Sequence, residues 1–85
     1  MRLTDENLIV RGLDDEVVML SLPSSTYYSA NEAGALLVHQ LLRGAERASL
    51  IALLMERYGI TQNVAATDVD EFLHQLRKHE LLVDS

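Results

Sequence analysis

The sequence contains no cysteine, one proline and four glycines, and its aromatic residues are three tyrosines and one phenylalanine. Without cysteine, neither a disulfide framework nor thiol chemistry is possible, and three scattered histidines are poor material for a zinc site. The low content of proline and glycine, without any repeat, predicts that the whole chain folds. Its 85 residues suit one domain, residues 1–85, with a single small core.

Long apolar runs and a basic surface are also lacking. No apolar stretch approaches the roughly 20 residues of a membrane span, and the charged first stretch does not resemble a signal peptide. We therefore expect a cytoplasmic protein without a membrane partner. The net charge of −6 repels phosphate backbones and favours basic or neutral partners, although acidity also serves solubility alone.

Motifs for catalysis and cofactor binding are missing as well. Ser24 and Ser25 are not part of a G-x-S-x-G elbow. His74 and His79 are five residues apart, whereas a helical metal pair prefers a spacing of four. The consecutive carboxylates of residues 14–16 suit a solvated turn, and there is no glycine-rich phosphate loop. We therefore expect no enzymatic activity and no cofactor.

Short β-branched and apolar runs in the first third of the chain predict three strands. They cover residues 6–11, 16–22 and 26–29. Residues 12–15 and Pro23-Ser24-Ser25 separate them with turn-forming sequence. In the second run, Leu20 and Leu22 alternate around Ser21. Strands linked by such short turns predict an antiparallel meander.

The rest of the chain predicts three helices. Asn31 is a favourable N-cap, because its side-chain oxygen accepts a hydrogen bond from an amide of the first turn. Gly44 and Gly59 are typical of helix ends. The helices begin at about residues 31, 47 and 63 and end at about residues 43, 58 and 79. The chain then closes with an apolar segment, residues 81–83, which predicts a final extended contact.

Each predicted helix carries an apolar stripe at helical spacing. The stripes are Ala33, Leu36, Leu37, Leu41 and Leu42, then Leu50, Leu53, Leu54 and Tyr58, then Ala65, Val69, Phe72, Leu73 and Leu76. Together these patterns predict an α+β, winged-helix-like fold with a three-stranded antiparallel sheet followed by three helices.

Winged-helix domains often bind DNA through the third helix. Here the early turns of that helix carry Asp68, Asp70 and Glu71, which would face phosphates, while Arg77 and Lys78 lie at its far end and fit the helix dipole. This placement of charge disfavours nucleic-acid binding. A winged-helix DNA-binding transcriptional regulator nevertheless remains one alternative hypothesis, and a protein–protein adaptor is the other.

Four segments in order carry a resemblance to a known family. After a strand pair come "TYYSANEAGALLVHQLLRG", "LIALLMERYGI" and "ATDVDEFLHQLRKHELL". Their order and spacing over residues 6–83 resemble the PqqD-like family, whose members are recognition elements for precursors of ribosomally made and modified peptides (RiPPs). Family members often have glycine near the end of the third helix, where this chain has Glu80. A free-standing chain of this size resembles the discrete recognition proteins of lasso-peptide biosynthesis.

The resemblance implies a division of labour. The protein would bind the leader region of a precursor peptide, and a separate leader peptidase and a separate cyclase would carry out the chemistry. The leader is implied to add as an extra strand to the third strand, in a groove completed by the third helix. Such pairing uses backbone groups for affinity and pockets for alternate side chains for selectivity.

The implied groove gives particular residues a role. Tyr27 and Tyr28 point to opposite faces of a strand, so we expect one to pack inward and the other to border the groove. Phe72, which has Asp68 and Gln75 near it at helical spacing, is expected to form a groove wall, with Asp68 as its polar rim. Val69, Leu73 and Leu76 are expected to be mainly core. The predicted leader-binding residues are Ser25, Thr26, Tyr27, Tyr28, Ser29, Asp68, Val69, Phe72, Leu73 and Leu76.

The acidic residues of the third helix have two interpretations. Asp68, Asp70 and Glu71 would attract lysine or arginine in a leader. Asp70 and Glu71 would equally suit compensation of the dipole at the start of the helix.

Overall fold

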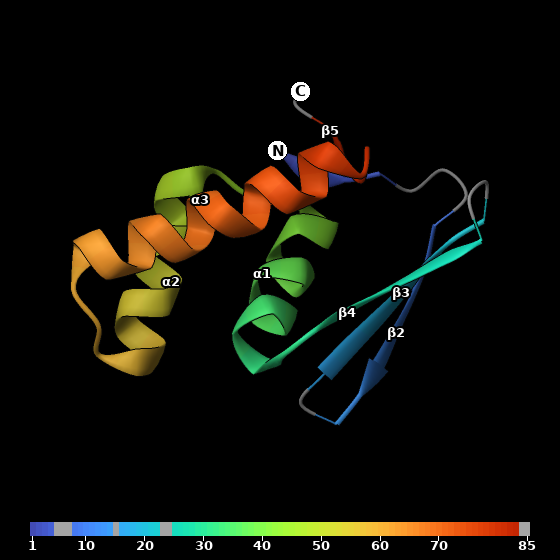
Figure 1. The fold of residues 1–85 in the computed structure, drawn as a ribbon. Helices are drawn as coiled ribbons and strands as arrows, with labels where there is room; N and C mark the ends of the chain where they lie inside the picture. The colour runs from blue at the N-terminus through green and yellow to red at the C-terminus, as the bar shows by residue number, and fades with distance from the viewer. Residues whose placement is uncertain (5–7, 15, 23–24, 84–85) are drawn as a thin grey trace.

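A computed structural model describes residues 1–4, 8–14, 16–22 and 25–83 (Figure 1). Three strands are followed by three helices: β2 (Leu8–Leu13), β3 (Glu16–Ser21), β4 (Thr26–Ala30), α1 (Glu32–Arg43), α2 (Arg47–Tyr58) and α3 (Gln62–Lys78). Two short strands, β1 (Arg2–Leu3) and β5 (Leu82–Val83), come before and after them. The predicted α+β class, with a three-stranded antiparallel sheet and three helices, is confirmed.

The sheet has the order β2-β3-β4, and both neighbouring pairs are antiparallel. In the register, Met19 lies opposite Tyr28, and Leu20 lies opposite Tyr27. Met19 is buried, so Tyr28 shares its helix-facing side of the sheet, and Leu20 and Tyr27 share the other side. The alternation of Leu20 with Leu22 therefore marks the outer face of the sheet.

The strand boundaries differ from the prediction by one or two residues. Glu6 and Asn7, predicted as strand, lie outside the described residues. At the first turn, β2 continues to Leu13 and Gly12 pairs with Val17, so the predicted turn of residues 12–15 was too long. Asp14 turns the chain instead, with a φ of 54°. β3 ends one residue earlier than predicted, and β4 continues one residue further.

Side-chain caps fix where α1 and α3 begin. The Oδ1 atom of Asn31 accepts a hydrogen bond from the Gly34 N–H at 3.0 Å, as predicted for the N-cap of α1. α3 begins before its predicted start, because the hydroxyl of Thr61 accepts a hydrogen bond from the Val64 N–H at 3.3 Å. The predicted bounds of α2 are confirmed.

The end of α3 accommodates the departure from the family pattern. Glu80 adopts a left-handed φ of 59°, the conformation that glycine usually supplies after a helix. The Leu81 N–H then donates to the carbonyl of Leu76 at 2.8 Å. The chain turns into β5, which pairs with β1, so the predicted final extended contact is confirmed for Leu82–Val83.

Most stripe residues form the core, but the stripes of α1 and α2 were predicted slightly out of position. Leu42 is 48% exposed and Tyr58 is also exposed, whereas Ile51, which was not predicted, is buried. Both faces of α2 carry apolar residues, so packing against α3 decides which face is covered. The buried apolar set comprises Leu3, Val17, Met19, Ala30, Ala35, Leu37, Val38, Leu41, Leu50, Ile51, Leu54, Ala65, Val69, Leu73, Leu76 and Leu81.

The helices cover one face of the sheet. α1 follows directly from β4 and packs against β3 and β1, while α3 packs along α2 and reaches β5 at its C-terminal end. Figure 1 shows α3 crossing over α1, with the three-stranded sheet at one side of the molecule. This arrangement places the edge strand β4 and the helix α3 on either side of the N-terminal half of α1.

Candidate functional site

The outer edge of β4 pairs with no other strand among the residues that the structure describes. In a β-ladder, successive residues direct their backbone groups alternately to one neighbour and to the other. Along β4 one alternate set therefore bonds to β3, and the other points toward the outer edge. Such an edge is available for pairing with an added strand.

Two hollows lie between β4 and α3, and together they are named here the β4–α3 groove. The first, of about 430 Å³, lies beside the start of α1 and is also lined by Asp68 and Glu71 of α3. The second, of about 270 Å³, lies nearer the C-terminal end of α3. Four residues line both hollows: Ser29, Ala30, Phe72 and Gln75. The Phe72 side chain therefore contributes to each hollow.

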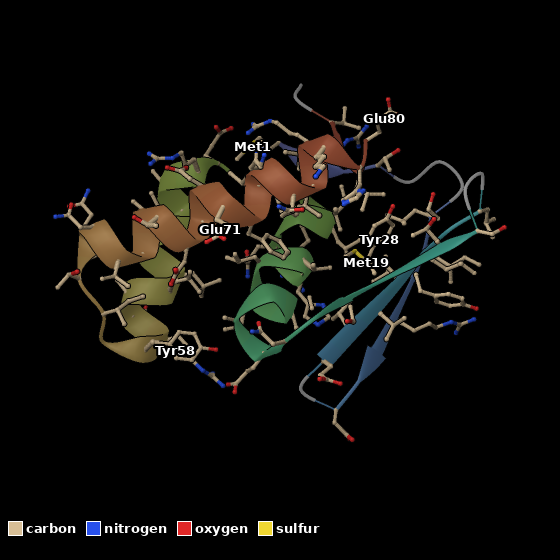
Figure 2. All side chains as sticks on the ribbon, viewed as in Figure 1. Met1, Met19, Tyr28, Tyr58, Glu71 and Glu80 are labelled. Atoms are coloured by element: carbon tan, nitrogen blue, oxygen red, sulfur yellow. The ribbon has the colours of Figure 1, made fainter. Side chains whose placement is uncertain are left out.

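The second hollow is mainly apolar. Met19 and Tyr28 line it from the sheet, and Leu76 and His79 line it from the end of α3. The rings of Tyr28 and His79 lie with their centroids 4.8 Å apart at an interplanar angle of 50°. Figure 2 shows Met19 and Tyr28 close together on the side of the sheet that faces the helices. This hollow has the lining expected for an apolar side chain.

The first hollow is more polar and carries negative charge. Asp68 and Glu71 are exposed and line it from α3, and Asn31 lines it from the start of α1. A further hollow shares Asn31 and Asp68 and extends to Tyr58 and Ile60. Figure 2 shows Tyr58 far from Tyr28, at the end of α2. The groove therefore changes from apolar near the end of α3 to acidic near the start of α1.

Asp70, the third acid of this stretch, lies outside both groove hollows. Its carboxylate accepts two hydrogen bonds from the guanidinium of Arg47, at 2.6 Å from Nε and 2.8 Å from Nη2. The hydrogen bond from Arg47 lowers the pKa of Asp70 below its usual value. The first turn of α3, all of which the structure describes, holds no acidic residue. Dipole compensation at the start of that helix therefore does not explain Asp70 or Glu71.

Several of the predicted site residues come together in the groove. Tyr28, Ser29, Asp68, Phe72 and Leu76 all line one or both hollows. Phe72 is half-buried, as its predicted position beside the apolar stripe requires.

The remaining predicted site residues lie elsewhere. Val69 and Leu73 are buried in the core and line neither groove hollow. Tyr27 is 70% exposed on the opposite face of the sheet, so Tyr28 is both the inward tyrosine and the one that borders the groove. Ser25 and Thr26, at the far end of β4, line neither hollow.

The predicted site omitted His79, Met19 and Gly34, which line the groove, and it named Gln75 only as a neighbour of Phe72. His79 and Gln75 are four residues apart, and Phe72 lies three residues before Gln75, so helical spacing alone places all three on one face. Met19 and Gly34 gave no comparable signal, since their positions depend on the sheet register and on helix packing.

Neither a metal site nor a membrane span is apparent in the described part of the chain. Within it, no group of three or more histidine, aspartate or glutamate side chains is arranged to hold a metal ion. None of its helices has the length and apolar character needed to cross a membrane.

An unpaired edge strand beside a groove with side-chain pockets defines a class of small domains that bind extended peptides. The family model for coenzyme PQQ synthesis protein D (PqqD) matches residues 16–82. The chain therefore belongs to the PqqD family, and the resemblance seen in the sequence is confirmed.

Two solved structures resemble all or nearly all of the chain. TbiB1 in complex with the TbiA(beta) leader peptide is 26% identical, with a TM-score of 0.90 and coverage of 100% of this chain and 98% of that one. Lasso peptide synthetase B1 complexed with the leader peptide is 25% identical, with a TM-score of 0.85 and coverage of 98% and 96%. A comparison with curated protein sequences gives no significant match.

Proposed function

We propose that this protein binds the leader region of a ribosomally made precursor peptide, in the biosynthesis of a lasso peptide or another RiPP. One observation carries the proposal: the outer edge of β4, which pairs with no other strand in the described part of the chain, borders a groove. Its support is a full-length similarity to two proteins solved with leader peptides. We further propose that binding takes place in the cytoplasm, where ribosomal peptides are made.

In the proposed complex, the leader extends the sheet as a strand next to β4. Backbone hydrogen bonds along the edge supply affinity with little selectivity, and side chains at alternate positions enter the groove. The hollow between Tyr28 and Leu76 suits an apolar side chain. At the other end of the groove, Asp68 and Glu71 favour a neutral or basic segment over an acidic one.

The proposed role is non-catalytic. The protein would hold the leader while a separate leader peptidase removes it and a separate cyclase closes the ring. This division follows from the proposed leader binding, in which the groove supplies contact surface and backbone pairing. Its support is the family membership and the two structures of related chains with leader peptides.

The groove also bears on the two alternative hypotheses. In a DNA complex, α3 would present Asp68 and Glu71 toward phosphates, which the net charge of −6 further disfavours. An adaptor for another folded protein would use the same groove and differ from a leader binder in its ligand. A direct binding experiment therefore separates the hypotheses.

The test is a titration of a fluorescently labelled leader, taken from a precursor peptide encoded beside this protein, followed by anisotropy. Saturable binding in the micromolar to nanomolar range, about 8 to 12 kcal/mol, is expected. A scrambled leader of the same composition is the control for charge alone. Binding that persists at high salt would assign most of the affinity to backbone pairing and apolar contacts. If the folded protein binds leader and scrambled peptide equally, or neither, leader recognition is refuted.

A further inference from the structure

We propose that Gly34 is a positioning residue for the groove: the absence of a side chain there lets the Phe72 ring lie against α1, which fixes the separation of the two hollows. This inference deepens the leader-binding function proposed above and rests on it for its consequence in binding. The contact between Gly34 and Phe72 is itself independent of any leader.

The geometry around Gly34 is unusually close. A Cβ atom at this position would lie 2.9 Å from the Cβ of Ala30 and 3.2 Å from Cε1 of Phe72. The first of these distances is shorter than carbon atoms tolerate, and the second would require the ring to move. Gly34 is therefore the point at which the end of β4, the first turn of α1 and the middle of α3 approach one another.

The backbone conformation at position 34 does not require glycine. Gly44 and Gly59 have positive φ values and end their helices, but Gly34 lies within α1 in ordinary helical conformation. At such a position alanine is favoured over glycine, because glycine loses more backbone entropy in a helix. The space between α1 and its neighbours is the feature that only glycine fits.

The two contacts that a side chain would disturb both belong to the groove. Ala30 and Phe72 each line the first and the second hollow. Side chains on one face of a strand recur about every 6.6 Å, so the position of the Phe72 ring determines whether two such side chains fit the two hollows together. A methyl group at position 34 would displace the Phe72 ring and narrow one of the two hollows.

The contact can be tested without a leader. Phe72 is the only phenylalanine of the chain, so its ring signals are identified by labelling phenylalanine alone. In the ligand-free protein, an NMR nuclear Overhauser effect is expected between the Phe72 ring protons and the α-protons of Gly34. If the folded protein shows none, the inference is overturned, whatever the protein binds.

The consequence for binding is tested by a double-mutant cycle. Gly34→Ala is expected to weaken leader binding about tenfold, while Gly12→Ala, where a Cβ would meet nothing within 4 Å, is the matched control and is expected to bind as the wild type does. In the Ala30→Gly/Phe72→Leu background both close contacts are relieved, so Gly34→Ala is expected to have little further effect there. The inference is refuted if Gly34→Ala binds like the wild type, or if, with glycine at position 30, its effect is as large with leucine at position 72 as with phenylalanine.

A second variant covers the case in which Gly34→Ala does not fold. In Ala30→Gly/Gly34→Ala the closer of the two contacts is removed and the contact with Phe72 is kept. This variant is expected to fold and to bind more weakly than Ala30→Gly alone, and equal binding would overturn the inference. If the wild type binds no leader, the proposed function fails, and the nuclear Overhauser effect still decides whether the Phe72 ring lies against Gly34.

Discussion

Pairing of a leader strand with β4 should slow amide hydrogen exchange in a pattern that contact within the groove alone does not produce. Neighbouring residues of a strand direct their N–H groups to opposite sides. In the five-residue strand β4, the amides bonded to β3 should therefore exchange slowly in the free protein. Among residues 27–30, the alternate amides that point toward the outer edge should exchange fast, because β4 pairs there with no other described strand. Binding of the leader as a strand should convert this fast set to slow exchange.

The size of the effect follows from mass action. An amide that exchanges only while the leader is absent is protected in proportion to the bound-to-free ratio. At a free leader concentration of 100 times Kd, exchange of the outer set of β4 amides should slow about 100-fold, equivalent to about 2.7 kcal/mol.

The assay is residue-resolved hydrogen exchange by NMR, with and without saturating leader. The sheet supplies an internal control, because β2 is its other edge strand and lies on the far side of β3 from the groove. Outer amides of β2 should remain fast when those of β4 become slow. If the outer amides of β4 stay fast while the protein is saturated with leader, or if those of β2 slow instead, strand addition to β4 is refuted.

Three substitutions test other parts of the structure. Phe72→Ala should weaken leader binding by about 1 to 3 kcal/mol in the anisotropy titration, with Val64→Ala, exposed on the same helix and outside both groove hollows, as the control; unchanged affinity in a folded Phe72→Ala variant would remove Phe72 from the site. Glu80→Gly should raise the free energy of unfolding, measured in urea, by roughly 0.5 to 1 kcal/mol. Glycine adopts the left-handed φ of position 80 without the steric penalty of a side chain, and this gain exceeds the extra entropy that glycine loses on folding. A loss of stability would contradict this. Arg47→Gln should raise the pKa of Asp70 toward its ordinary value, measured by NMR titration of its carboxyl carbon. Because the folded pKa of Asp70 is lowered, the ion pair stabilises the protein above the unfolded-state pKa and loses its effect as pH falls through the folded one; an unchanged titration would show that Arg47 does not act on Asp70.

The elements that local sequence determines were predictable. α1 begins at Asn31, whose side chain caps it, and ends at Gly44, whose backbone adopts a positive φ. Both residues could be identified without knowledge of the fold. The apolar period of α3 gave Val69 and Leu73 as core, and it placed Phe72 at the margin of the stripe, where the structure has it half-buried.

The parts that depend on pairing across the chain were not predictable. Whether Tyr27 or Tyr28 faces the groove is decided by the register that sets Met19 opposite Tyr28, and a shift of one residue would exchange the two. β1 was missed because two residues are too few to show a period, and it forms only by pairing with β5 at the other end of the chain. The closeness of Gly34 to Phe72 likewise arises from how α1 and α3 meet.

The acidity of the groove bears on how the protein keeps its edge strand available. An unpaired edge attracts other strands, including the same edge of a second copy. β4 is short, and a second copy would bring its own Asp68 and Glu71 toward the groove together with its net charge of −6. Like charges disfavour that encounter, whereas a neutral or basic peptide meets no such repulsion. Asp68 and Glu71 thus favour a neutral or basic peptide over a second copy of the chain at the edge that both would use.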